Sequence, residues 1–537
     1  VAAAENALAI LRDTEPELHL RSVTLTAKDK ICLCETRECT PEACPYANGY
    51  YARIKGALWD VLDVPCLTAE TLQEYAERHT VCPFELGLDS SLWSDVIIGD
   101  YNYLFDPVVH LVRFFESAGD YIFLVDEAHN LPGRAREMHS AALTKTSFYE
   151  AKKLLGKGKS SLKNALTKVN DVFIEWRHRA EEETAARDGR FGKTFFLKER
   201  SEEFDHLLNR LCEPLEAWLD DHREPDETHT ALLQLYFDVR AWLRVADTFD
   251  DHFVLQITAS GSEVRAAQLC LDPSAFLADS FALGRAAVLF SATLAPASYY
   301  KDLCGVPEAR AVALRSPFPA GNQGLFCIGN VSTRYKDRDA SLAIVAESLA
   351  TMVRARCGNY LAFFPSYAYM EQAYAQFKEH CPEINCIKQE NAMDEQQKAA
   401  FLAQFVPGPS QPLLGFAVMG GVFGEGVDLT GDRLIGVGIV GPGLPQVGPR
   451  QEQLRDYFEQ TRGSGFYYAY RYPGMNKVLQ AAGRVIRTPR DKGVVLLIDN
   501  RFAMPDYRRL MPPHWSHLKM IYDTEELERE LWRFWEE

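Results

Sequence analysis

Two carboxylates and a histidine directly follow an apolar run. Residues 121–125 predict a buried strand, and Asp126-Glu127-Ala128-His129 comes immediately after it. A carboxylate at a strand end suits a Mg²⁺ ion that bridges nucleotide phosphates, so we assign the metal to Asp126. Glu127 is then placed to orient or deprotonate an attacking water, with His129 completing the catalytic set. We expect a nucleotide and Mg²⁺ to meet here, the plain alternative being an acidic surface loop.

A second candidate group contains Gln480, Arg484 and Arg487. On a helix, this spacing places all three side chains on one face. Two guanidinium groups on one face suit a triphosphate, because they are fixed cations with forked donors, and one can act as an arginine finger. We include Gly483, which lies between them, among the nucleotide-binding residues. A solvated helix face is the alternative interpretation.

Two further segments carry weaker signals. The glycine-rich loop 420–428 lets the backbone approach a phosphate or ribose closely, and it adds Glu425, Gly426 and Asp428 to the candidate nucleotide site. A plain turn explains this loop almost as well. Ser291 and Thr293 place two hydroxyls behind another apolar run, where they can couple the nucleotide site to nucleic acid or simply cap a helix.

The elements that must position these residues alternate along the chain. Apolar runs bounded by small or polar residues predict strands buried on both faces, at 121–125, 286–290, 360–364, 413–418, 434–440 and 494–498. Helical patterns at 342–356, 368–380 and 396–405 lie between several of them. This alternation is typical of a mostly parallel α/β sheet, in which working residues collect at the carboxyl ends of the strands. Residues 137–250 predict instead a charged helical insertion, and a hairpin around Gly261-Ser262 follows it.

Composition limits the classes of protein that remain. A chain of 537 residues is too long for one core. Its 47% hydrophobic and 25% charged residues are typical of globular proteins, and no apolar run is long enough to span a bilayer. The net charge of −17 argues against a surface that grips phosphate everywhere, so any nucleic-acid contact must be local.

Cysteines concentrate near the N-terminus. Of the 13 in the chain, six lie between residues 32 and 82, and the others are scattered singly. One cluster in a large chain indicates a metal site in a reducing compartment rather than a disulfide framework. The spacing alone fits a four-cysteine zinc site as well as an iron–sulfur cluster. Beside the cluster, Tyr50, Tyr51, Arg53 and Lys55 interleave aromatic and basic groups, which suits either a single-strand contact or an ordinary helix face.

Taken in order, these motifs resemble those of the superfamily 2 helicases, and in detail the XPD/DinG branch, in particular its bacterial DinG-related members. The detailed likeness lies in Phe363-Phe364-Pro365-Ser366-Tyr367-Ala368-Tyr369-Met370-Glu371, in Val485-Ile486-Arg487 leading to Asp499-Asn500-Arg501-Phe502, and in Tyr101-Asn102-Tyr103-Leu104-Phe105-Asp106-Pro107. The likeness covers nearly the whole chain.

This resemblance implies an α/β fold with two RecA-like motor domains built on parallel sheets, a small cysteine-rich iron–sulfur domain and a helical arch insertion. The implied boundaries are motor domain 1 at 1–30, 94–136 and 251–325, the iron–sulfur domain at 31–93, the arch at 137–250, and motor domain 2 at 326–537.

The resemblance also implies cofactors and partners. Cys32, Cys39, Cys44 and Cys82 match the ligands of a [4Fe–4S] cluster, with Cys34 as a substitute for Cys32. Implied DNA or coupling residues are Ser291, Thr293, Tyr367 and Arg53. The implied activity is ATP-dependent 5′→3′ DNA unwinding or translocation on single-stranded or forked DNA, with a role in DNA repair. A monomer in the bacterial cytoplasm is implied as well.

One departure from the family pattern concerns the phosphate loop. The family's Gly-Lys-Thr loop occurs nowhere in this sequence, and residues 1–12 resemble the helix that follows the family's next early motif. We therefore expect the chain to begin downstream of that loop and to be inactive as an ATPase by itself. A single-stranded or forked DNA-binding module that lacks the loop is the alternative. A nuclease ranks last, because the sequence holds no nuclease constellation.

Overall fold

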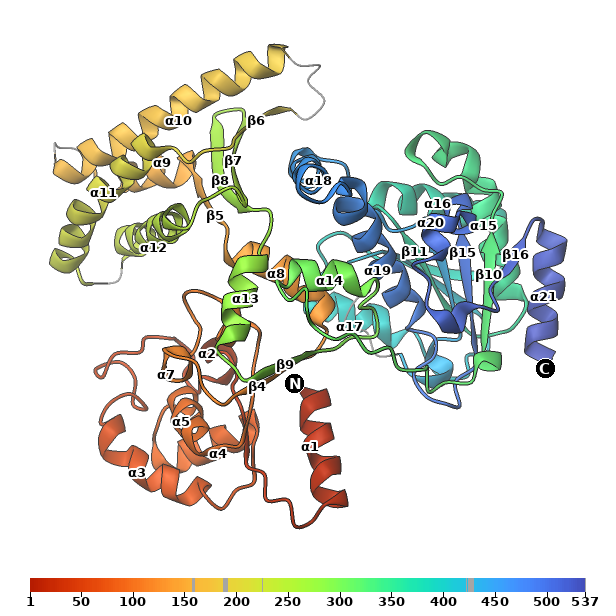
Figure 1. The fold of residues 1–537 in the computed structure, drawn as a ribbon, viewed down its shortest axis with the longest axis horizontal. Coiled ribbons are helices and arrows are strands. Elements are labelled where there is room, and N and C mark those ends of the chain that lie inside the picture. Colours follow the sequence, from red (N-terminus) through yellow and green to blue (C-terminus); the bar gives the residue numbers. More distant parts are fainter. Residues whose placement is uncertain (157–159, 187–191, 225, 422, 424–428, 537) are drawn as a thin grey trace. The chain divides into compact units, whose positions relative to one another are not determined.

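The computed structural model describes the chain except for residues 157–159, 187–191, 225, 422, 424–428 and 537 (Figure 1). It divides into two compact units, residues 1–117 and 118–537.

The first unit contains a small parallel sheet in the order β2 (Cys66–Leu67), β1 (Ser22–Thr24) and β3 (Val96–Ile98). The side chains of Val23, Ile54, Leu72 and Leu86 form much of its core. The helices of this unit are α1 (Ala2–Thr14), α2 (Lys28–Ile31), α3 (Tyr50–Val61), α4 (Ala69–His79), α5 (Pro83–Ser90), α6 (Asn102–Phe105) and α7 (Val112–Phe115).

A seven-stranded sheet organises the C-terminal part of the second unit. Its neighbouring strands are all parallel, as the sequence predicts. The order is β12 (Asn385–Lys388), β13 (Leu413–Val418), β11 (Asn359–Phe364), β14 (Gly436–Val440), β15 (Gly493–Ile498), β10 (Gln323–Ile328) and β16 (Lys519–Ile521).

Helices cover both faces of this sheet (Figure 1). Along each strand, alternate side chains enter different cores, so Tyr360 and Phe364 lie in one core while Leu361 and Phe363 lie in the other. The first core is closed by α15 (Arg338–Arg354), α16 (Tyr367–His380) and α21 (Thr524–Glu536). The second is closed by α17 (Glu395–Ala403) and α19 (Tyr472–Ala482).

The strand that precedes Asp126 pairs with only one neighbour. Strands β4 (Ile122–Val125) and β9 (Ala286–Leu289) form a two-stranded parallel sheet. Both strands are where the sequence predicts them, but the expectation of burial on both faces is wrong: Ile122 is 64% and Leu124 69% exposed. The reason is that no third strand pairs with them in the described part of the chain. The expected first motor domain is therefore distributed over two separate sheets.

The inserted segment combines helices with a sheet. The helices are α9 (Lys145–Leu154), α10 (Ser161–Ala186), α11 (Glu202–Asp221) and α12 (Glu227–Asp247). They pack on an antiparallel sheet ordered β5 (Ala141–Thr144), β8 (Glu263–Cys270), β7 (Phe253–Ser260) and β6 (Lys193–Leu197) (Figure 1). The predicted hairpin is β7–β8, with Gly261 at φ 60° in its turn. A boundary between residues 250 and 251 would cut this sheet, so the hairpin belongs with the insertion.

An apolar cluster joins the inserted sheet to the C-terminal part of the second unit. Leu269 and Leu271, in and directly after β8, share it with Tyr299 and Tyr300 of α14 (Ala297–Leu303). Phe458 of α18 (Pro449–Arg462) packs into the same cluster. The cluster continues into the π-helical segment Tyr467–Arg471, which runs directly into α19.

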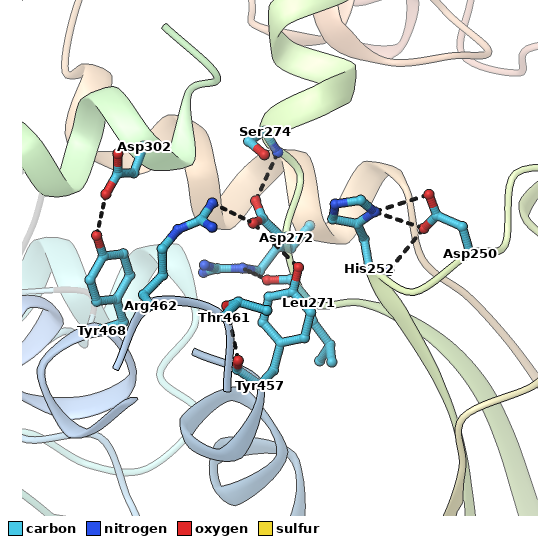
Figure 2. Close-up of polar contacts among 11 residues, drawn as sticks. Asp250, His252, Leu271, Asp272, Ser274, Asp302, Tyr457, Thr461, Arg462 and Tyr468 are labelled. Atoms are coloured by element: carbon cyan, nitrogen blue, oxygen red, sulfur yellow. Dashed lines mark hydrogen bonds and ion pairs between the residues drawn. The ribbon is translucent and has the colours of Figure 1, made fainter. Parts of the chain in front are cut away.

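Polar contacts flank this cluster (Figure 2). Asp272 is 1% exposed, and its carboxylate accepts hydrogen bonds from the backbone N–H of Ser274 at 3.1 Å and the Tyr457 hydroxyl at 3.5 Å. The Arg462 guanidinium lies 3.5 Å from the same carboxylate. Tyr468 donates its hydroxyl to Asp302 of α14. The junction thus combines buried aromatic packing with a buried charge that has a cationic partner.

Candidate nucleotide site

The backbone turns sharply after β4. Glu127 has φ 45°, in the left-handed region that a non-glycine residue occupies at a cost of about 1–3 kcal/mol. Its backbone N–H donates to the Asp126 carboxylate at 2.7 Å, and the next N–H, of Ala128, donates to Phe290 O beyond β9 at 3.1 Å. As a result, Asp126 and Glu127 are exposed while His129 is buried. Such strain is typical of functional turns.

His129 connects three chain segments. Its Nδ1 lies 2.7 Å from Ser291 Oγ and 3.1 Å from Glu127 Oε2. The Ser291 hydroxyl in turn donates to Glu127 Oε2 at 3.1 Å, and the side-chain amide of Gln480 contacts His129 Nε2. One tautomer fits all these contacts: Nδ1 carries the proton and faces the carboxylate, and Nε2 accepts from the amide.

This network sets the charge on Glu127. The hydrogen bond from His129 lowers the pKa of the Glu127 carboxyl below its usual value, with further contributions from Ser291 and the positive charge of Arg484. Burial works in the opposite direction but does not outweigh them. Glu127 is therefore held as an acceptor-only carboxylate, the form that a water-orienting base requires.

The structure brings together Glu127, His129, Ser291, Gln480 and Arg484. Thr293 is 6% exposed, and its N–H donates to Ser291 Oγ at 3.2 Å. This hydrogen bond shapes a turn, and Ser291 caps no helix in the described part of the chain.

The expected helix face of Gln480, Arg484 and Arg487 needs correction. Helix α19 ends at Ala482, because Gly483 and the β-branched pair that follows Arg484 favour leaving the helix. Arg484 is 8% exposed. Arg487 is exposed, and its backbone N–H donates to Asp491 at 2.7 Å. The two arginines therefore sit in different environments.

Part of the glycine-rich loop lies outside the described residues, including Glu425, Gly426 and Asp428. Gly420, at its start, has φ 72°, and a Cβ there would lie 2.9 Å from Lys477 Cε. The described start of the loop therefore lies against α19, the helix that carries Gln480.

The cysteine segment brings some thiols together. Cys34 Sγ and Cys44 Sγ are 3.8 Å apart. Burial, with Cys44 and Cys32 adding to it, raises the pKa of Cys34 to about 11. Cys39 is exposed, and Cys82 precedes α5 as its N-cap residue. No group of three or more histidine, cysteine or acidic side chains is arranged to hold a metal ion among the described residues. The donor chemistry suits a metal, but this geometry does not assemble the expected four-thiolate set.

Arg53 has a structural role that its sequence context did not indicate. Its guanidinium donates to Thr80 O at 2.9 Å and Pro45 O at 3.0 Å, and also to Asn48 O. It thereby braces the segments next to Cys44 and Cys82, and few of its donors remain for a nucleic-acid strand. Of its aromatic neighbours, Tyr50 is buried against Asp89, and Tyr51 is 88% exposed.

Tyr367 lies at the start of α16, where its hydroxyl accepts a hydrogen bond from Gln389 at 2.7 Å.

A second polar network, which is centred on Asp499, was not predicted from the sequence. Asp499 is fully buried and binds both Arg501 and Thr333. The Asp499-Asn500-Arg501 motif was a signal for it, but Thr333 carries no recognisable pattern.

Comparison with known proteins agrees with this arrangement. Two family models match the chain: DEAD_2 over residues 16–148, and the helicase C-terminal domain over residues 349–518. The XPD helicase subunit of the general transcription and DNA repair factor IIH from Schizosaccharomyces pombe is 24% identical over 83% of the chain. The chain is therefore similar to the XPD-like helicases, as a distant relative. The ATP-dependent DNA helicase CHL1 of Coccidioides immitis is 22% identical over 84% of the chain.

These XPD-like relatives are longer than the matched region, which covers 67% of the Schizosaccharomyces protein and 60% of the Coccidioides protein. A solved XPD helicase structure superposes with a TM-score of 0.59 at 18% identity, covering 94% of this chain and 87% of the other. This last likeness establishes the fold. In the described part of the chain, no helix is long and apolar enough to cross a membrane.

Proposed function

We propose that this XPD-like chain is the motor of an ATP-dependent DNA helicase or translocase that acts on single-stranded or forked DNA. One observation carries the proposal: Glu127, His129, Ser291 and Gln480 come from three distant segments and form one hydrogen-bonded network. Nucleotide-dependent motion between the two halves of a motor requires such a link. Hydrolysis at the end of strand β4 must be transmitted to helix α19, which carries Gln480.

Each residue has a part in this proposal. Asp126 would hold the Mg²⁺ ion that accompanies ATP, and that ion would neutralise phosphate charge. Glu127, kept ionised by His129, accepts a proton from or orients the attacking water. Arg484 and Arg487 supply positive charge for the triphosphate, Arg484 from a buried position. The residues Glu425, Gly426, Asp428 and Gly483 complete the proposed nucleotide site.

The proposal extends to DNA and to the cysteine segment. Ser291, Thr293 and Tyr367 couple the nucleotide site to a single strand that moves 5′→3′. Cys32, Cys39, Cys44 and Cys82 would hold a [4Fe–4S] cluster, although the described geometry does not bring all four thiols together. Support for the cluster comes from the family resemblance and from the concentration of thiols, two of whose sulfurs lie 3.8 Å apart. The protein acts as a monomer in the bacterial cytoplasm.

The test measures ATP hydrolysis with and without single-stranded DNA, together with displacement of a labelled strand from duplexes with 5′ or 3′ overhangs. We expect DNA-stimulated hydrolysis and displacement only from the 5′ overhang. Both this chain and a version extended upstream at its N-terminus should be assayed, because this also tests the expectation that the chain alone is inactive. DNA binding without hydrolysis in either version would favour the non-catalytic binding module instead.

A further inference from the structure

A short loop in the C-terminal part of the second unit exposes an aromatic ring between two cations. The loop 329–337 connects β10 to α15 at the carboxyl end of β10, and its last three residues form a 3-10 helical turn. Its residues Arg334, Tyr335 and Lys336 are exposed, and Tyr335 is 86% exposed. The chain's net charge of −17 makes this local basic segment more conspicuous.

The backbone beneath Tyr335 is firmly anchored. Thr333 donates its N–H to Asp499 Oδ2 at 3.0 Å and its hydroxyl to the same oxygen at 2.5 Å. Before it, Val331 O accepts the N–H of Asn500 at 2.6 Å. The end of β14 also presses on the loop, because a Cβ on Gly441, at φ 79°, would lie 2.7 Å from Thr333 Oγ1. The ring is thus displayed by a rigid support.

The far side of the loop is fixed in the same way. Ser332 donates its hydroxyl to the Asp337 carboxylate at 2.6 Å, so the one acidic group of the loop is already engaged. The Arg338 guanidinium lies between two rings, 5.4 Å from the centre of Tyr335 and 4.9 Å from that of Tyr369. It also donates to Ser366 Oγ at 3.3 Å. Asp339, in the first turn of α15, is exposed.

The exposed Tyr335 ring lies beside two cationic side chains at the carboxyl end of β10, and this combination suits one class of ligand. Nucleobases stack on aromatic rings with little regard to sequence, and neighbouring cations attract the phosphates. We propose that Tyr335 is a stacking platform for a base of single-stranded DNA, with Arg334 and Lys336 contacting the adjoining phosphates. This inference rests on the proposed function, and it assigns a strand-binding site that none of the helicase motifs includes.

Binding of a fluorescein-labelled oligothymidine, measured by anisotropy across a salt series, tests the proposal. Tyr335→Ala should weaken binding about 5- to 100-fold, because one stacked base is lost. Tyr335→Phe and Tyr335→Trp should bind like the parent protein, since the hydroxyl plays no part. The salt dependence should stay unchanged in Tyr335→Ala, whereas Arg334→Gln should lower the salt slope by about one counterion. An oligonucleotide carrying 2-aminopurine should be quenched by the parent protein and less so by Tyr335→Ala.

The matched control is Tyr149→Ala, which removes another exposed tyrosine, on α9 of the inserted domain, and should leave affinity unchanged. Thermal unfolding of Tyr335→Ala should match the parent, because the ring supports no core. If the parent protein binds oligothymidine and Tyr335→Ala binds equally well, the platform is wrong while the proposed function stands. If the parent protein binds no single-stranded DNA at all, the proposed function itself fails.

Discussion

Gln480 donates its side-chain amide to the imidazole of His129, which lies 351 positions earlier in the chain. The contact connects the end of α19 to the strained turn after β4. It also fixes the imidazole tautomer, because an Nε2 that accepts from the amide leaves the proton on Nδ1, facing Glu127. The His129 imidazole therefore contacts both the Glu127 carboxylate and Gln480 of the distal helix.

A double-mutant cycle can measure this link. His129→Ala and Gln480→Ala should each slow DNA-stimulated ATP hydrolysis, and the double variant should be little worse than the slower single one. Residues in direct contact commonly show coupling of about 0.5–3 kcal/mol, so the cycle should deviate from additivity by at least about twofold. Gln404→Ala, at an exposed glutamine, is the control. Strictly additive effects would contradict the link.

Glu127 itself should control the chemical step. Glu127→Gln keeps the shape but removes the charge, and we expect turnover to fall about 10²- to 10⁴-fold while nucleotide binding persists. Because His129 lowers the pKa of the Glu127 carboxyl below its ordinary 4.5, the group stays ionised throughout the neutral range. The pH–rate profile should then show no inflection from this carboxylate above about pH 5. Glu150→Gln, on an exposed face of α9, should change neither quantity.

The contact between Asp272 and Arg462 in Figure 2 should contribute to the stability of the protein. Arg462→Ala leaves the buried carboxylate of Asp272 without its cation, and we expect the free energy of unfolding to fall by about 1–3 kcal/mol. The loss should appear in the urea transition that separates the inserted domain from the C-terminal part. Arg223→Ala, which removes an arginine that is 81% exposed, should change stability by less than about 0.5 kcal/mol. Equal effects of the two substitutions would mean that the junction contributes little.

The sequence predicted some parts of this molecule better than others, for physical reasons. Strands such as β11 and β13 are buried on both faces, so continuous apolar runs in the sequence predicted them. The environments of Arg484 and Arg487 could not be predicted, because extending a helical spacing past Gly483 ignored the end of α19. The pairing of Asp272 with Arg462 had no signal at all, since single charged residues far apart in sequence leave no periodic trace.

Cysteine substitutions can distinguish two possible sets of cluster ligands. The family pattern includes Cys39 and gives Cys34 only as a substitute for Cys32, whereas the structure places Cys34 Sγ 3.8 Å from Cys44 Sγ and leaves Cys39 exposed. Protein purified without oxygen should contain iron and absorb near ~400 nm if the cluster is present. On the proposed ligand set, Cys39→Ser and Cys44→Ser lose iron and Cys34→Ser keeps it. If Cys34→Ser loses iron and Cys39→Ser keeps it, Cys34 is the ligand in place of Cys39. Zinc in place of iron would exclude the cluster.

The ion pair between the buried Asp499 and Arg501 should give stability a specific dependence on pH. Burial alone would raise the pKa of the Asp499 carboxyl, but the hydrogen bond and charge of Arg501, together with the Thr333 hydroxyl, hold that pKa below its usual 3.8. A carboxyl whose pKa is lower in the folded state stabilises the protein above its unfolded pKa, and this contribution disappears as the pH falls through the folded value. Asp499→Asn should cost about 3 kcal/mol at neutral pH, because it leaves the largely buried Arg501 without its charged partner. Measured by urea unfolding, the gap between parent and variant should narrow below about pH 4. Asp220→Asn, at an exposed carboxylate, should show no such gap at any pH.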